Sequence, residues 1–347
     1  MRGTQGEVIW PRLVANKILR KGWGSSNFVA DFPSNRESLL DTTRSESFDH
    51  DQTCLNSNSI LYHHQDIHKY KVFVSTWNVG GIEPKEDLKL EDLLDTSSTT
   101  CDIYVLGFQE IVPLKASNVL GTENTKISTK WNFLIREALN KKRPTGRQDE
   151  AQQSQTLHED HSKKNVHNDK NMHPNTEGKS IEISTAPQDF QCIISKQMVG
   201  ILISVWVRGH LRPFIRYPNV DCVGCGIMGC LGNKGSVSAR FQLHETNFCF
   251  VCSHLASGDR KGDEKIRNSN VAEIFSRTSF PGQPLLDLPR KILDHDQVIF
   301  LGDLNYRISS AEDLTRFMVK KKDWNALLKK DQLRMELING DTLRNWH

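Results

Sequence analysis

Apolar and polar positions form blocks of strand and helix length in two parts of the chain, residues 70–140 and 190–330. Short apolar runs rich in Val, Ile and aromatic residues predict strands. These runs cover 70–77, 102–109, two stretches within 190–207, 237–243, 247–254 and 297–301. Apolar residues at helical spacing predict helices over 127–140, 262–277 and 310–330. Strands that alternate with helices favour an α/β fold.

Two segments depart from this pattern and divide the chain. Residues 1–69 include a stretch over 34–65 rich in Ser, Asp, Asn and His, and they predict a mostly flexible N-terminal extension. Residues 141–179 contain almost no large apolar side chain and predict a disordered insertion. The remainder of 70–347 is expected to form one domain that this insertion interrupts.

Polar side chains follow several of the predicted strands at the point where each strand ends. They are Asn78, Gln109 with Glu110, Ser253 with His254, and Asp303 with Asn305. One polar strand end carries little information, but four in one chain indicate that these groups converge on one rim of a sheet core. The sequence therefore predicts a single constructed site.

The oxygen donors of this set suit a hard cation. An unpaired carboxylate at Glu110, directly after an apolar strand, is costly unless a partner or a cation satisfies it. Asn78, Glu110, Asp303 and Asn305 offer the few oxygen ligands that Mg²⁺ takes from proteins, whereas zinc prefers Cys and His. The alternative for Glu110 is a structural carboxylate that caps a following helix.

Three further groups have both a chemical and a structural interpretation. Asp303 and Asn305, at positions i and i+2, fit the orientation of a water and a phosphoryl oxygen, or a simple turn after a strand. His254 fits a donor to phosphate in the transition state, or a hydrogen-bonded structural histidine. Lys234, in a glycine-rich loop that lacks the P-loop spacing, fits a point charge near phosphate, or a solvated side chain in a tight turn.

Two Cys-x-x-Cys pairs resemble a zinc ribbon only in their spacing. Cys222 and Cys225 form one pair, and Cys249 and Cys252 form the other. The second pair lies in a predicted strand, where residues i and i+3 face opposite sides and cannot bind one metal ion. We therefore expect buried thiols.

Composition and charge exclude several classes of protein. The 347 residues carry a net charge of +3, a balance too mild to indicate binding to duplex DNA. No apolar run reaches the roughly 18 residues that span a bilayer, and the N-terminus lacks the apolar core of a secretory signal. We therefore expect a cytoplasmic protein with reduced cysteines. A basic stretch over 8–22 predicts an exposed helix face, with peripheral membrane contact as the alternative.

Five motifs in a fixed order carry a resemblance to a known family. They are STWNVGG (75–81), GFQEIVPL (107–114), GNKGSVS (232–238), SHLASG (253–258) and GDLNYRI (302–308). Together they resemble the catalytic domain of the inositol polyphosphate 5-phosphatases, in the DNase-I-like endonuclease/exonuclease/phosphatase superfamily. Within that family the plant type I enzymes look most similar, and the resemblance covers 70–347 apart from the insertion.

The resemblance implies a four-layer α/β/β/α sandwich and a role for each strand-end residue. It implies that Glu110 binds Mg²⁺, with Asn78 supporting the metal or the attacking water. Asp303 would help activate that water, while Asn305 and His254 would hold the scissile phosphate. The implied reaction is in-line attack by water on the phosphoryl group.

The resemblance also implies the substrates. These are phosphoinositides and soluble inositol polyphosphates, such as phosphatidylinositol 4,5-bisphosphate and inositol 1,4,5-trisphosphate, which lose the 5-phosphate in signalling. Asn233, Lys234, Arg267 and Arg307 are the candidates for contacts with phosphate or inositol. Inositol phosphate head groups are the expected partners, and no nucleic acid is expected.

The chain departs from the family pattern toward its C-terminus. Segments resembling PTYKY, PxWCDR and SDHRPV follow in the family and do not occur here. We therefore expect a catalytic domain that is incomplete at its C-terminus. Two alternatives stay open: an inactive short isoform that binds phosphoinositide or a partner, and a DNase-like nuclease of the same superfamily.

Overall fold

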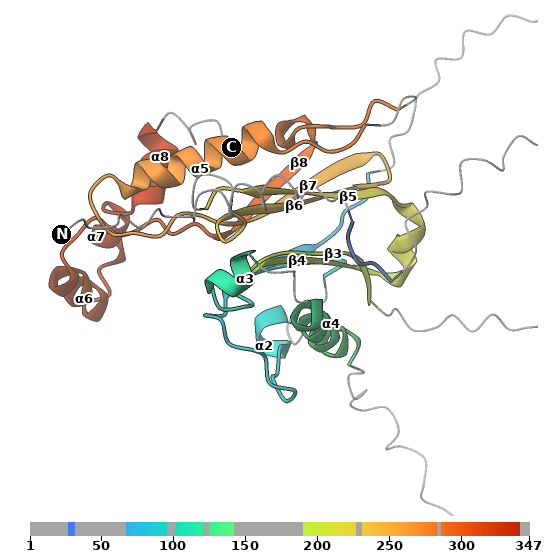
Figure 1. Cartoon of the computed structure of the whole chain (residues 1–347), viewed down its shortest axis with the longest axis horizontal. Coiled ribbons are helices and arrows are strands. Elements are labelled where there is room, and N and C mark those ends of the chain that lie inside the picture. Colours follow the sequence, from blue (N-terminus) through green and yellow to red (C-terminus); the bar gives the residue numbers. More distant parts are fainter. Residues whose placement is uncertain are drawn as a thin grey trace, which may run out of the picture.

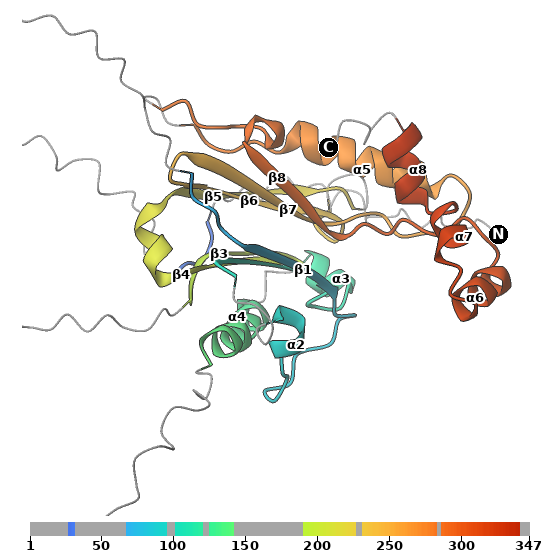
Figure 2. The ribbon, with the colours of Figure 1, turned by 180° about the vertical axis from the view of Figure 1, so that it is seen from behind.

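The computed structural model describes residues 27–31, 67–95, 101–120, 125–141, 190–226, 231–282 and 286–340. Two four-stranded sheets pack face to face, and helices cover their outer faces (Figure 1, Figure 2). This arrangement confirms the four-layer α/β/β/α sandwich that the sequence predicted.

The first sheet has the strand order β1-β2-β4-β3. Its strands are β1 (Val72–Asn78), β2 (Ile103–Gln109), β3 (Phe190–Met198) and β4 (Ile201–Arg208). β1 and β2 are parallel and in register from Val72↔Ile103 to Asn78↔Gln109. β2 is buried along its whole length, which explains its continuous apolar run. Since parallel strands end at the same edge, the residues after β1 and β2 are neighbours.

The second sheet has the strand order β5-β6-β7-β8. Its strands are β5 (Ile215–Gly224), β6 (Gly235–Leu243), β7 (Thr246–His254) and β8 (Gln297–Asp303). β7 and β8 are parallel, and the pair His254↔Asp303 ends their register. A 3₁₀ segment, η1 (Gly209–Phe214), leads from β4 into β5. The second sheet therefore also presents the ends of two parallel strands.

Helices lie on the outer face of each sheet (Figure 1). α2 (Glu91–Leu94), α3 (Ala116–Leu120) and α4 (Thr125–Asn140) lie on the side of the first sheet. α5 (Asp263–Arg277), η3 (Ile292–Asp294) and α8 (Gln332–Asn339) lie on the side of the second. α6 (Glu312–Lys320) and α7 (Trp324–Leu328) lie at one end of the sandwich, near α8 (Figure 1, Figure 2).

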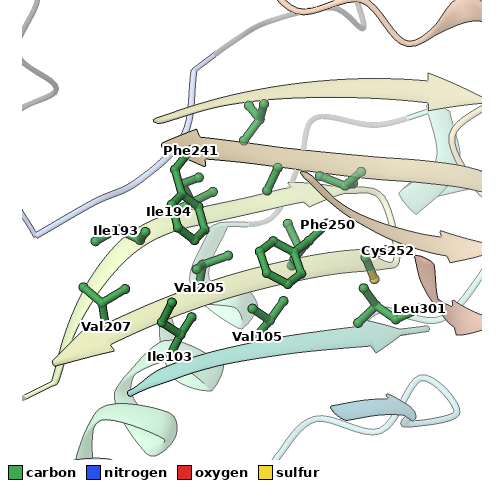
Figure 3. Packing of buried hydrophobic residues seen from close by; sticks show 14 of the residues in the cluster. Ile103, Val105, Ile193, Ile194, Val205, Val207, Phe241, Phe250, Cys252 and Leu301 are labelled. Atoms are coloured by element: carbon green, nitrogen blue, oxygen red, sulfur yellow. The ribbon is translucent and has the colours of Figure 1, made fainter. Parts of the chain in front are cut away.

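Aliphatic and aromatic side chains from both sheets fill the space between them (Figure 3). Ile103 and Val205 of the first sheet share this core with Phe250 and Leu301 of the second. Each such side chain, once fully buried, contributes roughly 1.5–3 kcal/mol to folding. At Gly107 a Cβ atom would lie 2.8 Å from both Cys252 Sγ and Leu301 Cδ1. Glycine therefore lets β2 approach the opposite sheet closely.

The secondary structure predicted from the sequence differs from the structure in several places. The helices α2, α3 and α8 were not predicted. Residues 310–330 form two helices instead of one, because the backbone at Lys322 is left-handed (φ 55°) and Asp323 starts α7 by accepting a hydrogen bond from the Ala326 amide. β5 was missed, because Pro218 and a register shift between Arg216 and Asn219 interrupt its apolar pattern. The other predicted strands and helices are present, with shifted ends.

The cysteines of the second Cys-x-x-Cys pair face opposite sides of β7, as predicted. Cys252 lies in the core between the sheets, and Cys249 lies in the cluster of the outer face with residues of α5. Burial raises the pKa of each thiol to about 12, so both stay protonated at neutral pH.

Residues 27–31 add a short extended segment to β3. Val29 and Ser195 exchange both backbone hydrogen bonds, at 2.9 and 2.8 Å. The Asp31 carboxylate accepts a bond from the Cys192 amide (2.8 Å) and pairs with Arg136 of α4. The remainder of the predicted N-terminal extension, except 67–69, lies outside the described residues. So does the predicted insertion beyond Lys141.

Among the described helices, none combines the length and hydropathy that crossing a bilayer requires.

Gly302 lies next to the strand-end residue Asp303 and provides a test of the sheet geometry. Its φ is +132°, and a Cβ there would overlap the Ser253 carbonyl oxygen. We expect Gly302→Ala to lower the free energy of unfolding by about 1–3 kcal/mol more than Gly262→Ala. Gly262 is a matched control, because its φ is also positive (+100°) but a Cβ added there would meet no atom within 4 Å. Urea unfolding measures both, and equal losses would contradict the prediction.

Candidate functional site

The ends of β1, β2, β7 and β8 meet at one edge of the sandwich. Asn78 of β1 donates from Nδ2 to Glu110 Oε1 (3.2 Å) and to Asp303 Oδ2 (2.9 Å). Glu110 follows β2 in the first sheet, whereas Asp303 ends β8 in the second. One amide group therefore joins two carboxylates that come from different sheets.

Glu110 adopts a left-handed backbone conformation that is uncommon for this residue. Its φ is 55°, and its carbonyl oxygen accepts a hydrogen bond from the Gly81 amide (2.8 Å). A Cβ at Gly200 would lie 3.3 Å from the Glu110 Cα, so glycine gives the strained backbone room. The next helix, α3, begins only at Ala116, and the carboxylate accepts from Asn78. These contacts place Glu110 in the strand-end cluster, at a distance from any helix cap.

His254 and Lys234 form a close pair beside the two carboxylates. Lys234 Nζ lies 2.6 Å from His254 Nε2, which in turn lies 3.4 Å from Asp303 Oδ2 and 3.8 Å from Glu110 Oε1. Burial, together with the Lys234 charge, lowers the pKa of His254 to about 4, although Asp303 and Glu110 oppose this shift. We therefore assign a neutral imidazole whose Nε2 accepts from the Lys234 ammonium. The Nδ1 atom is buried and has no hydrogen-bond partner among the described residues.

Asn305 ties the segment after β8 to the segment after β7. Its side-chain amide donates to the Leu255 carbonyl (3.0 Å), and its Oδ1 accepts from Arg307 Nη2 (3.1 Å). Its backbone amide donates to Asp303 Oδ1 (3.1 Å). Both oxygens of Asp303 are therefore held, one by Asn305 and one by Asn78. The polar groups of this cluster are fixed by one another.

Two of the predicted substrate-contact residues, Arg267 and Asn233, have polar atoms buried in the surrounding structure. Arg267 of α5 is fully buried, and its guanidinium donates to the carbonyls of Ala256 and Gly258 and to Gln332 Oε1. Asn233 turns its Oδ1 into its own loop, where a Cβ at Gly226 would overlap that atom. The Arg267 side chain thus supports loops in this structure, and Asn233 Oδ1 is buried without a hydrogen-bond partner among the described residues.

The donor set fits a hydrated hard cation. The side chains of Glu110 and Asp303 are 29% and 26% exposed, so both carboxylates can be reached from solvent. No group of three or more His, Cys, Asp or Glu residues in the described part of the chain has the geometry of a complete metal cage. Mg²⁺ needs only one or two carboxylates and keeps several waters, whereas structural zinc takes four protein ligands. Asn78 directs its amide nitrogen to the carboxylates and its oxygen to the Gly80 amide, so it orients the carboxylates.

Sequence reasoning missed Gln332 of α8, which touches the segment after β8. Its Oε1 accepts from the Arg307 backbone amide and from Arg267, both at 2.8 Å. It does not follow a buried strand, and a polar residue at the start of a helix is ordinary. No sequence signal distinguishes it, because only the fold brings α8 to this edge.

Comparison with known proteins gives consistent results. The family described as Endonuclease/Exonuclease/phosphatase family 2 matches residues 75–347. An Arabidopsis thaliana protein named type IV inositol polyphosphate 5-phosphatase 9 is 59% identical over 344 residues, which cover 97% of this chain and 74% of that protein. A second, named type I inositol polyphosphate 5-phosphatase 8, is 43% identical and covers 97% of this chain and 71% of that protein. The motifs resembled those of the plant type I enzymes, and of these two relatives one is named type IV and the other type I.

A solved structure is similar as well. It is the inositol polyphosphate 5-phosphatase domain of a synaptojanin in complex with inositol (1,4)-bisphosphate and a calcium ion. The TM-score is 0.58 at 26% sequence identity, and the match covers 79% of this chain and 63% of that chain. This likeness supports the sandwich fold described above.

The lowered pKa of His254 predicts how this residue titrates. In metal-free protein we expect the imidazole to stay neutral down to about pH 4, well below its ordinary pKa of 6.5. Because protonation then favours the unfolded chain, the contribution of His254 to stability is complete above pH 6.5 and is lost as the pH falls toward 4. NMR of the imidazole nitrogens measures the pKa.

Removal of the neighbouring ammonium provides the control for this prediction. Lys234→Met should raise the pKa of His254 part of the way toward 6.5, because burial, the larger cause, persists. Lys320→Met, on α6, should leave it unchanged. A wild-type His254 that titrates near 6.5 would contradict the assignment of a neutral, Lys234-bonded imidazole.

Proposed function

Because the chain belongs to the inositol polyphosphate 5-phosphatase family of the endonuclease/exonuclease/phosphatase superfamily, we propose that it removes the 5-phosphate from phosphatidylinositol 4,5-bisphosphate and inositol 1,4,5-trisphosphate. One observation carries this proposal: the Asn78 amide joins the carboxylates of Glu110 and Asp303 beside the Lys234–His254 pair. In the hydrolysis of a phosphate ester, carboxylates can bind a metal ion and orient the attacking water, and cationic groups can offset the charge on the phosphoryl oxygens.

Asp303 is proposed to orient the attacking water. One carboxylate oxygen is bonded to the Asn305 amide and the other to Asn78, so its direction is fixed before a substrate arrives. A fixed carboxylate can accept a proton from water as the water attacks in line with the leaving group. This pre-organisation avoids the cost of ordering the group during the reaction.

Lys234 is proposed to stabilise charge that develops on the phosphoryl oxygens, and His254, whose Nε2 accepts from the ammonium, to hold that ammonium in place. The ammonium is partly desolvated, and burial lowers the pKa of Lys234 while Asp303 and Glu110 oppose that shift. A positive charge in such a site interacts more strongly with an anion than it would in water. Asn305 and Arg307, which are bonded to each other, would contact other oxygens of the same phosphate.

A Mg²⁺ ion is proposed to bind at Glu110, where it would offset negative charge on the phosphoryl group. The partly exposed carboxylates of Glu110 and Asp303, which the Asn78 amide joins, support this choice. The similar synaptojanin domain was solved with calcium, another hard divalent cation. The lipid substrate lies in a bilayer, so peripheral membrane contact is part of the proposal.

The central experiment is a phosphate-release assay of the purified protein with inositol 1,4,5-trisphosphate. We expect release with Mg²⁺ and its loss in EDTA, with partial or no recovery in Ca²⁺. A parallel assay on vesicles with and without phosphatidylinositol 4,5-bisphosphate separates the soluble from the lipid substrate. Cleavage of plasmid DNA without phosphate release would instead favour a nuclease, and inositol phosphate binding without release would favour a binding role.

Substitution of Asp303 tests its proposed role. Asp303→Asn should lower kcat by about 10²–10⁴, since it removes the group proposed to accept the proton from water. Asp296→Asn is the matched control, because Asp296 precedes the opposite end of β8 and accepts hydrogen bonds there from Asn247. The thermal unfolding of both variants should resemble that of the wild type. Full activity of Asp303→Asn would exclude the proposed role.

A further inference from the structure

Gln332 joins the start of α8 to the segment that carries the proposed phosphate ligands. Its side-chain oxygen accepts from the Arg307 backbone amide (2.8 Å), and its own backbone amide donates to the Arg307 carbonyl (3.0 Å). The neighbouring residues Ile308 and Asp331 form an isolated antiparallel bridge. The backbone of Arg307 is thus held on both sides by one residue of the helix.

The same oxygen of Gln332 also accepts from a buried cation. Arg267 Nη2 lies 2.8 Å from it, while Nη1 of the same guanidinium lies 3.1 Å from the Gly258 carbonyl and 3.4 Å from the Ala256 carbonyl. The guanidinium also lies over the Tyr306 ring, 5.4 Å from its centroid. One fully buried side chain therefore connects α8 with the segment that follows His254.

The acceptors around Arg267 indicate what it does. A buried guanidinium without polar partners would be strongly unfavourable. Here two carbonyls and one amide oxygen accept from it, and within the described residues no carboxylate does so. All three partners are neutral. Arg267 therefore links the segment after β7, which provides the two carbonyls, to α8, which provides Gln332. Because Arg267 is fully buried, it has no face open to a substrate phosphate.

The two segments that this network holds are the two that fix Asn305. Asn305 Nδ2 donates to the Leu255 carbonyl, next to Ala256, and Asn305 Oδ1 accepts from the Arg307 side chain. The direction of the Asn305 side chain therefore depends on the distance between the segment after β7 and the segment after β8. Arg267 and Gln332 set that distance.

From this geometry we infer that Gln332 and Arg267 are positioning residues, which align Asn305 and Arg307 for the phosphate without touching it. The inference rests on the proposed hydrolytic function of the cluster. The inference gives α8 a role in the reaction, although α8 lies outside the five motifs of the sequence.

Three substitutions on α8 test the inference. Gln332→Ala removes both accepted bonds, and we expect kcat for inositol 1,4,5-trisphosphate to fall about 10–100-fold with KM within about threefold, because small misplacements of reacting groups cost that much. Gln332→Glu keeps an acceptor for Arg267 and for the Arg307 amide, so kcat should recover to within about threefold of the wild type. Leu337→Ala, at an exposed position of the same helix, is the matched control and should change nothing.

A second measurement does not depend on turnover. In a ¹H–¹⁵N NMR spectrum, the side-chain amide signals of Asn305 should shift in Gln332→Ala and in Arg267→Lys. They should stay in place in Gln332→Glu and Leu337→Ala. If Arg267→Lys does not fold, the Gln332 series alone decides. The unfolding temperature of Gln332→Ala should fall by several degrees, because the buried Arg267 guanidinium loses one of its acceptors. The kinetics are therefore compared at a temperature at which both proteins are fully folded.

Different experimental results would overturn this inference and the proposed function. An active wild type, with Gln332→Ala equally active and its Asn305 signals unmoved, would overturn the positioning role. So would a loss of kcat that Leu337→Ala shares, because this would indicate general loosening of α8. A wild type that releases no phosphate would overturn the proposed function, while the Asn305 signals would still decide whether Gln332 positions that side chain.

Discussion

Gly107 leaves β2 without a side chain at the point where it faces Cys252 and Leu301 of the opposite sheet. This contact sets how closely the two sheets approach. The Asn78 amide reaches from β1 to Asp303 in the second sheet at 2.9 Å, and it can do so only because the sheets are close there. Parallel pairing within each sheet then brings the remaining strand ends to the same edge. The position of the cluster at the edge of the sandwich therefore depends on how closely the two sheets pack in the core.

The ionisable groups of the cluster lie close together and fix one another. Two carboxylates lie beside one ammonium, and the imidazole between them is kept neutral by burial and by Lys234. Each group is bonded to another member of the cluster or to the backbone that carries it. Such a network keeps its shape before a ligand binds, although it requires that polar groups be removed from water. The strained backbone at Glu110 fits the same pattern, because strain of this kind persists where the surrounding structure enforces it.

The features that could be predicted from the sequence were those that depend on neighbouring residues along the chain. Asn78, Glu110, His254 and Asp303 each follow an apolar run, and this pattern indicated both the strands and the shared edge. Arg267 and Asn233 were assigned to substrate contact, but whether a side chain on a helix or loop faces outward depends on packing. Gln332 gave no local signal, since its role follows from the docking of α8. β5 escaped prediction because Pro218 and a bulge obscure its alternation.

The segment 27–31 has a consequence for where the folded unit begins. The bonds between Val29 and Ser195, and those of Asp31 with Cys192 and Arg136, attach this segment to β3 and to α4. β3 is the last strand of the first sheet, and an unpaired last strand is open to pairing with another molecule. A shortened protein that began at residue 70 would keep all five of the motifs found here, yet it would leave β3 open to pairing with another molecule.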